Sequence, residues 1–197
     1  GDKVAIVGPN GTGKTTLLRD IIKGENPAIR LGENVKMAYL SQMHGEVFDE
    51  KATVLKNFED AGFDTDDQVT AYLKTYGFEE ELIYSPVCDL SGGEKNLLQL
   101  AKISRTGAGL LLLDEPTSHL DTYSQLALEQ AVEKYNGTVL MVSHDFYTVA
   151  NCMDYVLLTE DKGLRRVSMR KFRKMIYADH FDKDYLEYEQ KKKELEN

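Results

Sequence analysis

The sequence predicts an α/β fold in which a mainly parallel sheet carries helices and is interrupted by a helical insertion. Short apolar runs alternate with segments of helical periodicity over most of the 197 residues, and this alternation is typical of βαβ units. A glycine-rich loop joins the first apolar run to the first helix. The stretch from about residue 47 to 86 carries no strand signal, which places the insertion there.

The elements of the first half follow from the spacing of apolar residues. Residues 4–7 are an apolar run that predicts a buried strand, and residues 16–23 place apolar pairs four apart, as on one face of a helix. Gly24 stands where that helix would end. Residues 35–40 predict a second strand. The helical pattern of the insertion is carried by Val54, Leu55 and Phe58 and then by Val69, Tyr72, Leu73 and Tyr76.

The second half repeats the alternation of strand and helix. Residues 110–113 are four leucines, a run suited to a central parallel strand that is buried on both faces. The other predicted elements are a helix after residue 93 with Leu97, Leu98, Ala101 and Ile103 on its apolar face, a helix at 122–135, a strand at 138–142, two strands at 155–158 and 164–167 around a turn, and a polar helix from residue 169.

The composition is that of an ordinary soluble chain, with 42% hydrophobic and 29% charged residues. No apolar run approaches the length of a membrane span, and no signal peptide is recognised. We therefore expect a cytoplasmic protein with no direct membrane insertion. Cys88 and Cys152 are far apart in the sequence and lack metal-type neighbours, which indicates reduced thiols.

The net charge of −9 is distributed unevenly. Acidic residues dominate residues 46–81 and basic residues dominate residues 162–174, so two faces with different partners are expected. The basic strip consists of Lys162, Arg165, Arg166, Arg170, Lys171, Arg173 and Lys174. It fits either a surface for nucleic-acid phosphates or the solvated edge of a hairpin and helix.

Residues 8–15 read GPNGTGKT and match G-x-x-x-x-G-K-[ST], the phosphate-binding P-loop. The glycines let backbone N–H groups close on phosphate oxygens, and the start of the following helix adds partial positive charge. We expect Lys14 to neutralise the β- and γ-phosphates of a nucleotide and the Thr15 hydroxyl to ligate Mg²⁺. The predicted binding residues are Gly8, Pro9, Asn10, Gly11, Thr12, Gly13, Lys14, Thr15 and Thr16.

Two acids follow the leucine run directly, Asp114 and Glu115. An apolar strand that ends in an acid is the Walker B pattern, in which Asp114 would help to hold Mg²⁺. Glu115 is one residue further on, where it can polarise the attacking water as a general base. Together with the P-loop, the pair predicts hydrolysis of a nucleoside triphosphate.

A third motif lies between the P-loop and the Walker B strand, where residues 90–95 read LSGGEK. In this order the motif resembles the signature of the ABC ATPases. The resemblance implies an ABC-type nucleotide-binding domain of the P-loop NTPase fold. It also implies that Ser91, Gly92 and Gly93 contact the γ-phosphate of ATP held by a second ABC nucleotide-binding domain.

Three further residues are similar to the ABC pattern. Gln42 follows the second predicted strand and resembles the Q-loop glutamine, Asp121 resembles the D-loop residue at the dimer interface, and His144 matches the switch histidine after the strand at 138–142. The resemblance implies ATP and Mg²⁺ as cofactors. It gives catalytic roles to Glu115, His144 and Gln42 and metal ligation to Thr15, Gln42 and Asp114.

Within this family the chain is similar to the ABC-F branch from residue 1 to about 176. The pair Glu94-Lys95 and His119 are typical of that branch, and residues 84–87 lack the acidic element that exporters carry ahead of the signature. The segment around His144 and the basic strip look most like the C-terminal ATPase domain of antibiotic-resistance members. The resemblance implies action on the ribosome and its rRNA, as a translation factor or in antibiotic resistance. The alternative is the ATP-binding subunit of an ABC membrane transporter.

The same resemblance divides the chain into four parts. Residues 1–44 and 101–168 would form a RecA-like core, the first part with the P-loop and Q-loop and the second running from Walker B to the hairpin. Residues 45–100 would form a helical subdomain with the signature, and residues 169–197 a C-terminal helical extension. Because the chain begins almost directly on the first strand, we also expect it to be an excised piece.

Overall fold

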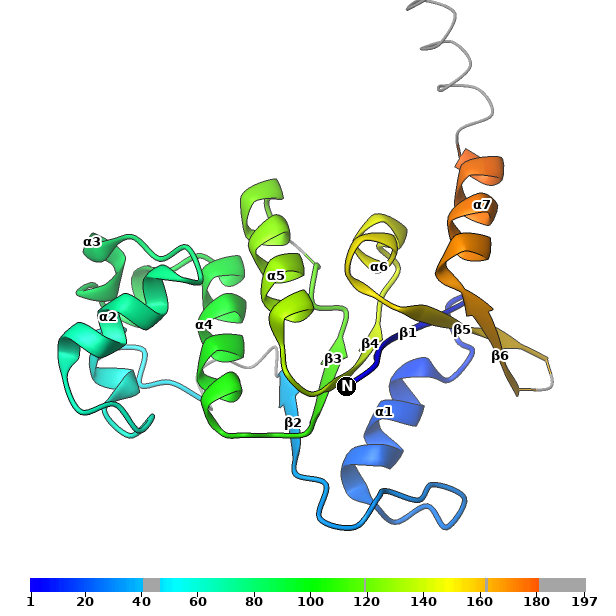
Figure 1. Ribbon diagram of the computed structural model, residues 1–197, viewed down its shortest axis with the longest axis horizontal. Helices are drawn as coiled ribbons and strands as arrows, with labels where there is room; N and C mark the ends of the chain where they lie inside the picture. The colour runs from blue at the N-terminus through cyan, green and yellow to red at the C-terminus, as the bar shows by residue number, and fades with distance from the viewer. Residues whose placement is uncertain (41–46, 119, 162, 181–197) are drawn as a thin grey trace, which may run out of the picture.

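The computed structural model describes residues 1–40, 47–118, 120–161 and 163–180, with side chains to residue 176. Its strands form one sheet in the order β2-β3-β4-β1-β5-β6 (Figure 1). Neighbouring strands are parallel except for β5 and β6, which form an antiparallel hairpin. The predicted α/β fold with a mainly parallel sheet is therefore confirmed. The strands are β1 (Lys3–Val7), β2 (Met37–Leu40), β3 (Leu110–Asp114), β4 (Thr138–Val142), β5 (Tyr155–Glu160) and β6 (Gly163–Ser168).

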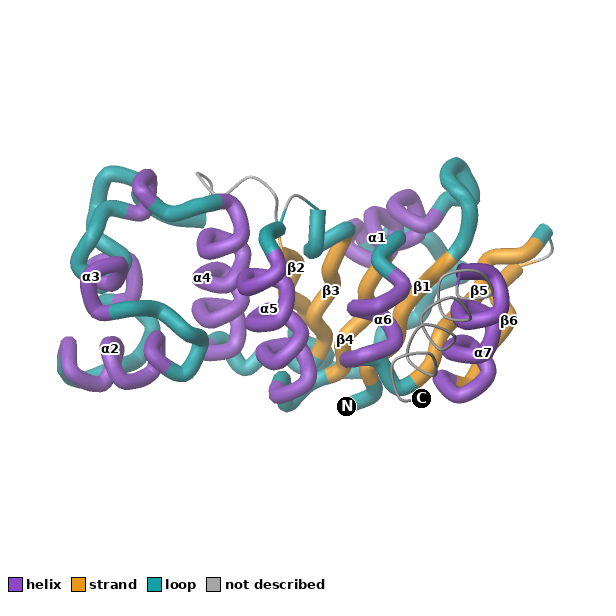
Figure 2. Tube along the Cα trace, turned by 90° about the horizontal axis from the view of Figure 1, so that it is seen from above, coloured by secondary structure: helices purple, strands orange, loops and turns teal. Residues whose placement is uncertain are grey.

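Helices cover both faces of the sheet (Figure 2). One face carries α1 (Lys14–Lys23), and the other carries α5 (Thr122–Lys134), α6 (Phe146–Cys152) and α7 (Met169–His180), with α4 (Gly92–Arg105) packed beside α5 and against β2. The leucines of β3 pack against the helices on both faces of the sheet, because successive side chains of a strand point to opposite faces. Leu112 packs into the cluster under α1, whereas Leu111 and Leu113 belong to the cluster on the other side.

The insertion between β2 and α4 is helical, as predicted, and lies beyond α4 at the β2 end of the sheet (Figure 1). It contains the 3₁₀ turns η2 (Lys56–Phe58) and η3 (Val87–Asp89) and the helices α2 (Asp66–Lys74) and α3 (Glu80–Ile83). Phe58, Leu73 and Ile83 are fully buried and form part of its core. No helix in the described ranges is both long enough and apolar enough to cross a membrane.

Two local predictions were wrong, and one element was missed. Val54 and Leu55 do not start an α-helix, because their N–H groups donate across to the carbonyls of Ser85 and Ile83. The second strand begins at Met37 rather than at residue 35, since the N–H of Val35 bonds back to the carbonyl of Gly32 in a turn. The short helix α6 was not predicted from the sequence at all.

Candidate nucleotide site

The loop between β1 and α1 takes its shape from two glycines. Gly11 and Gly13 have φ values of 79° and 85°, in the left-handed region that glycine adopts without strain. Gly13 is the N-cap residue of α1, and none of the side chains in the described part of the chain caps that helix. The first N–H groups of α1 are therefore directed to a ligand, at a helix end that favours negative charge.

Lys14 is folded into this loop and is only 6% exposed. Its Nζ donates to the carbonyl oxygens of Gly8 and Pro9, at 2.8 and 2.7 Å. The Thr12 hydroxyl donates to the same Pro9 oxygen at 2.9 Å. Because a buried ammonium needs such partners, the loop carbonyls hold the positive charge at the centre of the site.

A residue far away in the sequence supports the loop. Thr159 of β5 donates through its hydroxyl to Thr12 Oγ1 at 3.1 Å, across 147 residues of chain. A Cβ at Gly8 would lie 1.7 Å from Thr159 Oγ1. Gly8 is therefore required by this close approach, and Thr159, which sequence reasoning missed, fixes one side of the loop.

Asp114 and Thr15 bring two oxygen atoms together next to the P-loop. Asp114 is the last residue of β3, and its Oδ1 accepts from the Thr15 hydroxyl at 3.4 Å. Carboxylate and hydroxyl oxygens are ligands that suit Mg²⁺. Among the described residues, no group of three or more His, Cys, Asp or Glu side chains could hold a metal ion alone. This pair therefore fits a Mg²⁺ ion that is shared with phosphate oxygens.

Glu115 occupies an unusual backbone conformation, with φ at 48°. A non-glycine residue held there costs about 1–3 kcal/mol and persists only where its surroundings impose it. Here the Glu115 N–H donates to the carbonyl of Val142 at 2.8 Å, and its own carbonyl accepts from Ser118. Such strain is concentrated at functional sites, which agrees with the predicted catalytic position.

The side chains of Glu115 and His144 meet at the ends of β3 and β4. Glu115 Oε1 lies 3.3 Å from His144 Nε2, and Glu115 Oε2 accepts from the His144 backbone N–H at 3.2 Å. Because β3, β4 and β1 are neighbours in the sheet, this pair lies beside the P-loop at the same edge. Gln42, the third predicted catalytic residue, lies outside the described residues.

The signature residues form a separate turn at the start of α4. The Ser91 hydroxyl accepts from the Glu94 N–H at 3.2 Å, and Glu94 Oε2 accepts from the Ser91 N–H at 2.7 Å. This capping box satisfies two groups at the helix end. The S-x-x-E pattern that encodes it is readable in the sequence, although the role of Glu94 was not predicted.

The two signature glycines have different surroundings. A Cβ at Gly93 would lie 2.7 Å from Ser124 Cβ and 3.0 Å from Leu120 Cδ2, whereas nothing lies within 4 Å of a Cβ at Gly92. Gly93 is thus required for close packing against α5. Gly92 leaves the backbone open to a ligand.

Asp121 begins α5 next to this turn. Its carboxylate accepts from the N–H and the hydroxyl of Ser124 at 2.9 and 3.0 Å. These hydrogen bonds hold the pKa of the Asp121 carboxyl below its usual range. Since Gly93 packs on Ser124, the Ser91 and Asp121 turns form one surface.

A cavity of about 840 Å³ lies elsewhere, between α2, the end of α4 and α5. Tyr72, Tyr76, Tyr123 and Tyr135 line part of it, and none of its lining residues belongs to the predicted nucleotide site. The site residues are instead placed along the open edge of the sheet where parallel strands end, which is where open α/β sheets bind ligands.

Three features define an ABC-type ATPase domain: a P-loop closed on the buried Lys14, an acid pair at the end of β3, and a histidine after the neighbouring β4. The separate LSGG turn at the start of α4 distinguishes it from other P-loop folds. The chain belongs to the ABC transporter family, whose model matches residues 1–118.

Known relatives place the chain near the ABC-F branch, as predicted. It is 42% identical to ABC transporter F family member 5 of Arabidopsis thaliana over 166 residues, which are 82% of this chain and 24% of that protein. It is 36% identical to the energy-dependent translational throttle protein EttA of Mycobacterium tuberculosis, over 80% of this chain and 29% of EttA. The chain spans about a quarter of the length of the first curated relatives it matches.

A solved structure also matches the fold. The archaeal ribosome recycling factor aABCE1, in complex with the ribosomal stalk protein aP1, has a TM-score of 0.66 and 29% identity. The match covers 90% of this chain and 37% of aABCE1.

Proposed function

We propose that this chain is the ATP-hydrolysing domain of an ABC-F protein that acts on the ribosome. The ATPase part of this proposal rests on one observation. Lys14, the Thr15–Asp114 oxygens and the Glu115–His144 pair lie close together at the ends of neighbouring strands. These are the charges that phosphoryl transfer requires: a cation for the phosphates, oxygen ligands for Mg²⁺ and a base for water.

Each side chain has a role that its contacts support. Lys14 and the backbone of residues 8–16, in which every residue except Pro9 offers an N–H group, bind the phosphates of ATP. Thr15 and Asp114, together with Gln42, would hold Mg²⁺, which would supply positive charge against the charge that develops on the phosphates. Glu115 accepts the proton of the attacking water, and His144 orients the Glu115 carboxylate and contacts the γ-phosphate.

A second nucleotide-binding domain completes the pocket in this proposal. Ser91, Gly92, Gly93 and Asp121 lie together at the starts of α4 and α5. The helix α4 contacts β2, which is three strand steps from β1 in the sheet. With neighbouring strands about 4.8 Å apart, about 14 Å separate β2 from β1, the strand that leads into the P-loop. The Ser91 turn is therefore assigned to a nucleotide that the second domain holds.

The substitution Glu115→Gln tests the catalytic role. ATP turnover should fall by about 10²- to 10⁴-fold because the general base is lost, while binding of ATP is retained. Glu133→Gln, the same change at an exposed position of α5, is the control. Turnover that stays unchanged in Glu115→Gln would exclude Glu115 as the base.

The ribosomal part of the proposal is supported by the similarity to EttA, a translational throttle protein, and to the ribosome recycling factor aABCE1. It is also supported by the basic strip, whose residues 165–174 lie on β6 and α7, while Lys162 lies outside the described residues. Part of the strip is engaged within the fold. Arg165 pairs with Glu160, and Arg166 lies 3.8 Å above the ring of Tyr155. Arg170 and Lys171 are exposed at the start of α7, so these two are the better candidates for phosphate contacts.

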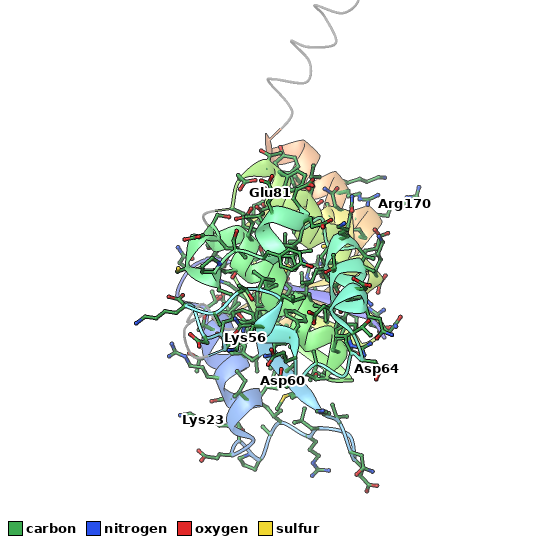
Figure 3. The ribbon with its side chains drawn as sticks, turned by 90° about the vertical axis from the view of Figure 1, so that its left-hand side faces the viewer. Lys23, Lys56, Asp60, Asp64, Glu81 and Arg170 are labelled. Atoms are coloured by element: carbon green, nitrogen blue, oxygen red, sulfur yellow. The ribbon has the colours of Figure 1, made fainter. Side chains whose placement is uncertain are left out.

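Charge reversal at Arg170 and Lys171 tests this surface. If both contact rRNA phosphates, the slope of log binding constant against log salt should decrease in magnitude by about 1.4–1.8, or 0.7–0.9 per lost contact. Lys23→Glu with Lys56→Glu makes the same charge change at separate parts of the surface (Figure 3). An unchanged slope in the Arg170/Lys171 variant would count against the strip.

Co-sedimentation distinguishes the ribosomal function from the transport alternative. The Glu115→Gln form of the longer natural protein should pellet with ribosomes when ATP is added. Recovery with membranes instead would favour the ATP-binding subunit of a transporter.

A further inference from the structure

A partly buried polar network connects α5 to the start of α6, directly next to His144. Gln125 and Glu129 come from α5, and Asp145 and Thr148 come from the first turn of α6. Thr148 is fully buried and Glu129 is 8% exposed. Buried polar groups are costly unless they are hydrogen-bonded, so these bonds fix the position of α6 relative to α5.

The Gln125 amide joins the two helices. Its Nε2 donates to Asp145 Oδ2 at 2.6 Å and to Thr148 Oγ1 at 2.8 Å. The Thr148 hydroxyl donates in turn to Glu129 Oε1 at 2.7 Å. Both protons of one amide are thereby used to hold the first turn of α6.

Asp145 directly follows His144 and is held from both sides. Its Oδ1 accepts from the N–H groups of Tyr147 and Thr148, both at 3.1 Å, so it caps α6. Its own N–H donates to Ser143 Oγ at 3.0 Å. Gln125 binds the remaining carboxylate oxygen, and the backbone on either side of His144 is therefore restrained.

We propose that Gln125 is a positioning residue for His144 and acts through Asp145. The catalytic consequence rests on the proposed ATPase function, whereas the positioning itself does not. Gln125 also lies one helical turn after Asp121, whose carbonyl accepts its N–H at 2.9 Å. The turn that carries Asp121 is thus joined to the His144 backbone by one side chain.

The test uses Gln125→Met, which keeps an unbranched side chain of similar length and removes both donors. Two measurements are made. The ring ¹H–¹³C NMR signals of His144 are recorded on the purified chain and assigned by comparison with His144→Gln, and kcat and KM for ATP are measured on the longer natural protein together with its second nucleotide-binding domain. We expect the His144 signals to move and kcat to fall about 10- to 100-fold, because small misplacements of a catalytic group are costly. KM should stay within about twofold, since phosphate binding by Lys14 is untouched. Gln130→Met makes the same change at an exposed position of α5 and should leave both measurements unchanged.

The outcomes separate the two proposals. Unmoved His144 signals in Gln125→Met would overturn the inference, because the network would then only pack α5 against α6. A shifted signal with kcat unchanged would overturn the catalytic part. If the unsubstituted longer protein failed to turn over ATP, the proposed function would fail, and the NMR comparison on the chain would still decide the positioning role.

Discussion

The two glycines of the signature turn give a sharp prediction, because alanine at each position meets a different environment. At Gly93 the added methyl group would lie 2.7 Å from both Ser124 Cβ and Ser124 Oγ and 3.0 Å from Leu120 Cδ2. Ser124 is buried on α5 and its hydroxyl is bonded to Asp121, so it cannot move aside freely. At Gly92 nothing lies within 4 Å.

The difference in stability can be estimated from these distances. Overpacking a close contact costs about 1–3 kcal/mol. Replacing glycine by alanine in a helix stabilises the folded chain by about 0.5–1 kcal/mol. This gain is common to both variants and cancels when their stabilities are compared. Gly93→Ala should therefore be about 1–3 kcal/mol less stable than Gly92→Ala. For a chain of this size, each kcal/mol of stability shifts the melting temperature by about 2–4 °C. The melting temperatures of the two variants should therefore differ by about 2–12 °C.

Thermal unfolding followed by circular dichroism measures this difference. Gly92→Ala should melt at or slightly above the temperature of the unsubstituted chain, yet lose ATP turnover, because its methyl group obstructs the approach of the Gly92 backbone to a phosphate. Equal melting temperatures for the two variants would refute the assignment of Gly93 to packing. Full turnover in Gly92→Ala would refute the assignment of Gly92 to the ligand.

Three further predictions concern the P-loop support and the cysteines. Gly8→Ala should weaken ATP binding, and adding Thr159→Ala to the same chain should partly restore it, because Thr159 Oγ1 is the atom that the new Cβ meets. Titration with a fluorescent nucleotide measures both affinities. A thiol reagent at pH 8 should label exposed Cys88 rapidly and leave Cys152 unlabelled until the chain unfolds, because Cys152 is buried and burial raises the pKa of its thiol to about 12. The same pKa predicts that Cys152 lowers the free energy of unfolding as pH rises from about 9 to 12, since the unfolded thiol loses its proton in this range and the folded thiol keeps it. Urea unfolding of Cys152→Ala against the parent chain should show a smaller loss across that range.

The sequence predicted the elements better than their arrangement. The strands at 110–114 and 138–142 were recognisable because a run of large apolar residues suits a strand buried on both faces. The position of β1 between β4 and β5 depends on pairing across more than a hundred residues, and no local pattern encodes it. Val54 and Leu55 were misjudged for the same reason, since their partners Ser85 and Ile83 come from the far end of the insertion.

The site shows the same division between local motifs and distant support. Lys14, Asp114 and His144 were predicted because each belongs to a short motif next to a strand end. Thr159 and Gln125 were not, because each acts on a motif that is distant in sequence, and a single threonine or glutamine on a strand or helix has no distinctive spacing.

The contacts of Lys14 indicate how the loop is prepared for an anion. Bringing an ammonium group out of water is costly, and in this fold the Gly8 and Pro9 carbonyls already meet that cost. A phosphate that enters the loop exchanges neutral carbonyl partners for negatively charged oxygens, so the attraction between opposite charges is added to the hydrogen bonds. The exchange is therefore favourable, and Lys14 does not have to be withdrawn from solvent for it.

Lys14→Met should therefore lower the affinity for phosphate more than it lowers folding stability. The two carbonyls can bond to water at the exposed loop, whereas the phosphates lose the only buried cation in the described part of the site. Calorimetric titration with ATP beside a thermal melt measures both quantities, and a melting temperature that falls while the affinity is unchanged would contradict this account of the loop.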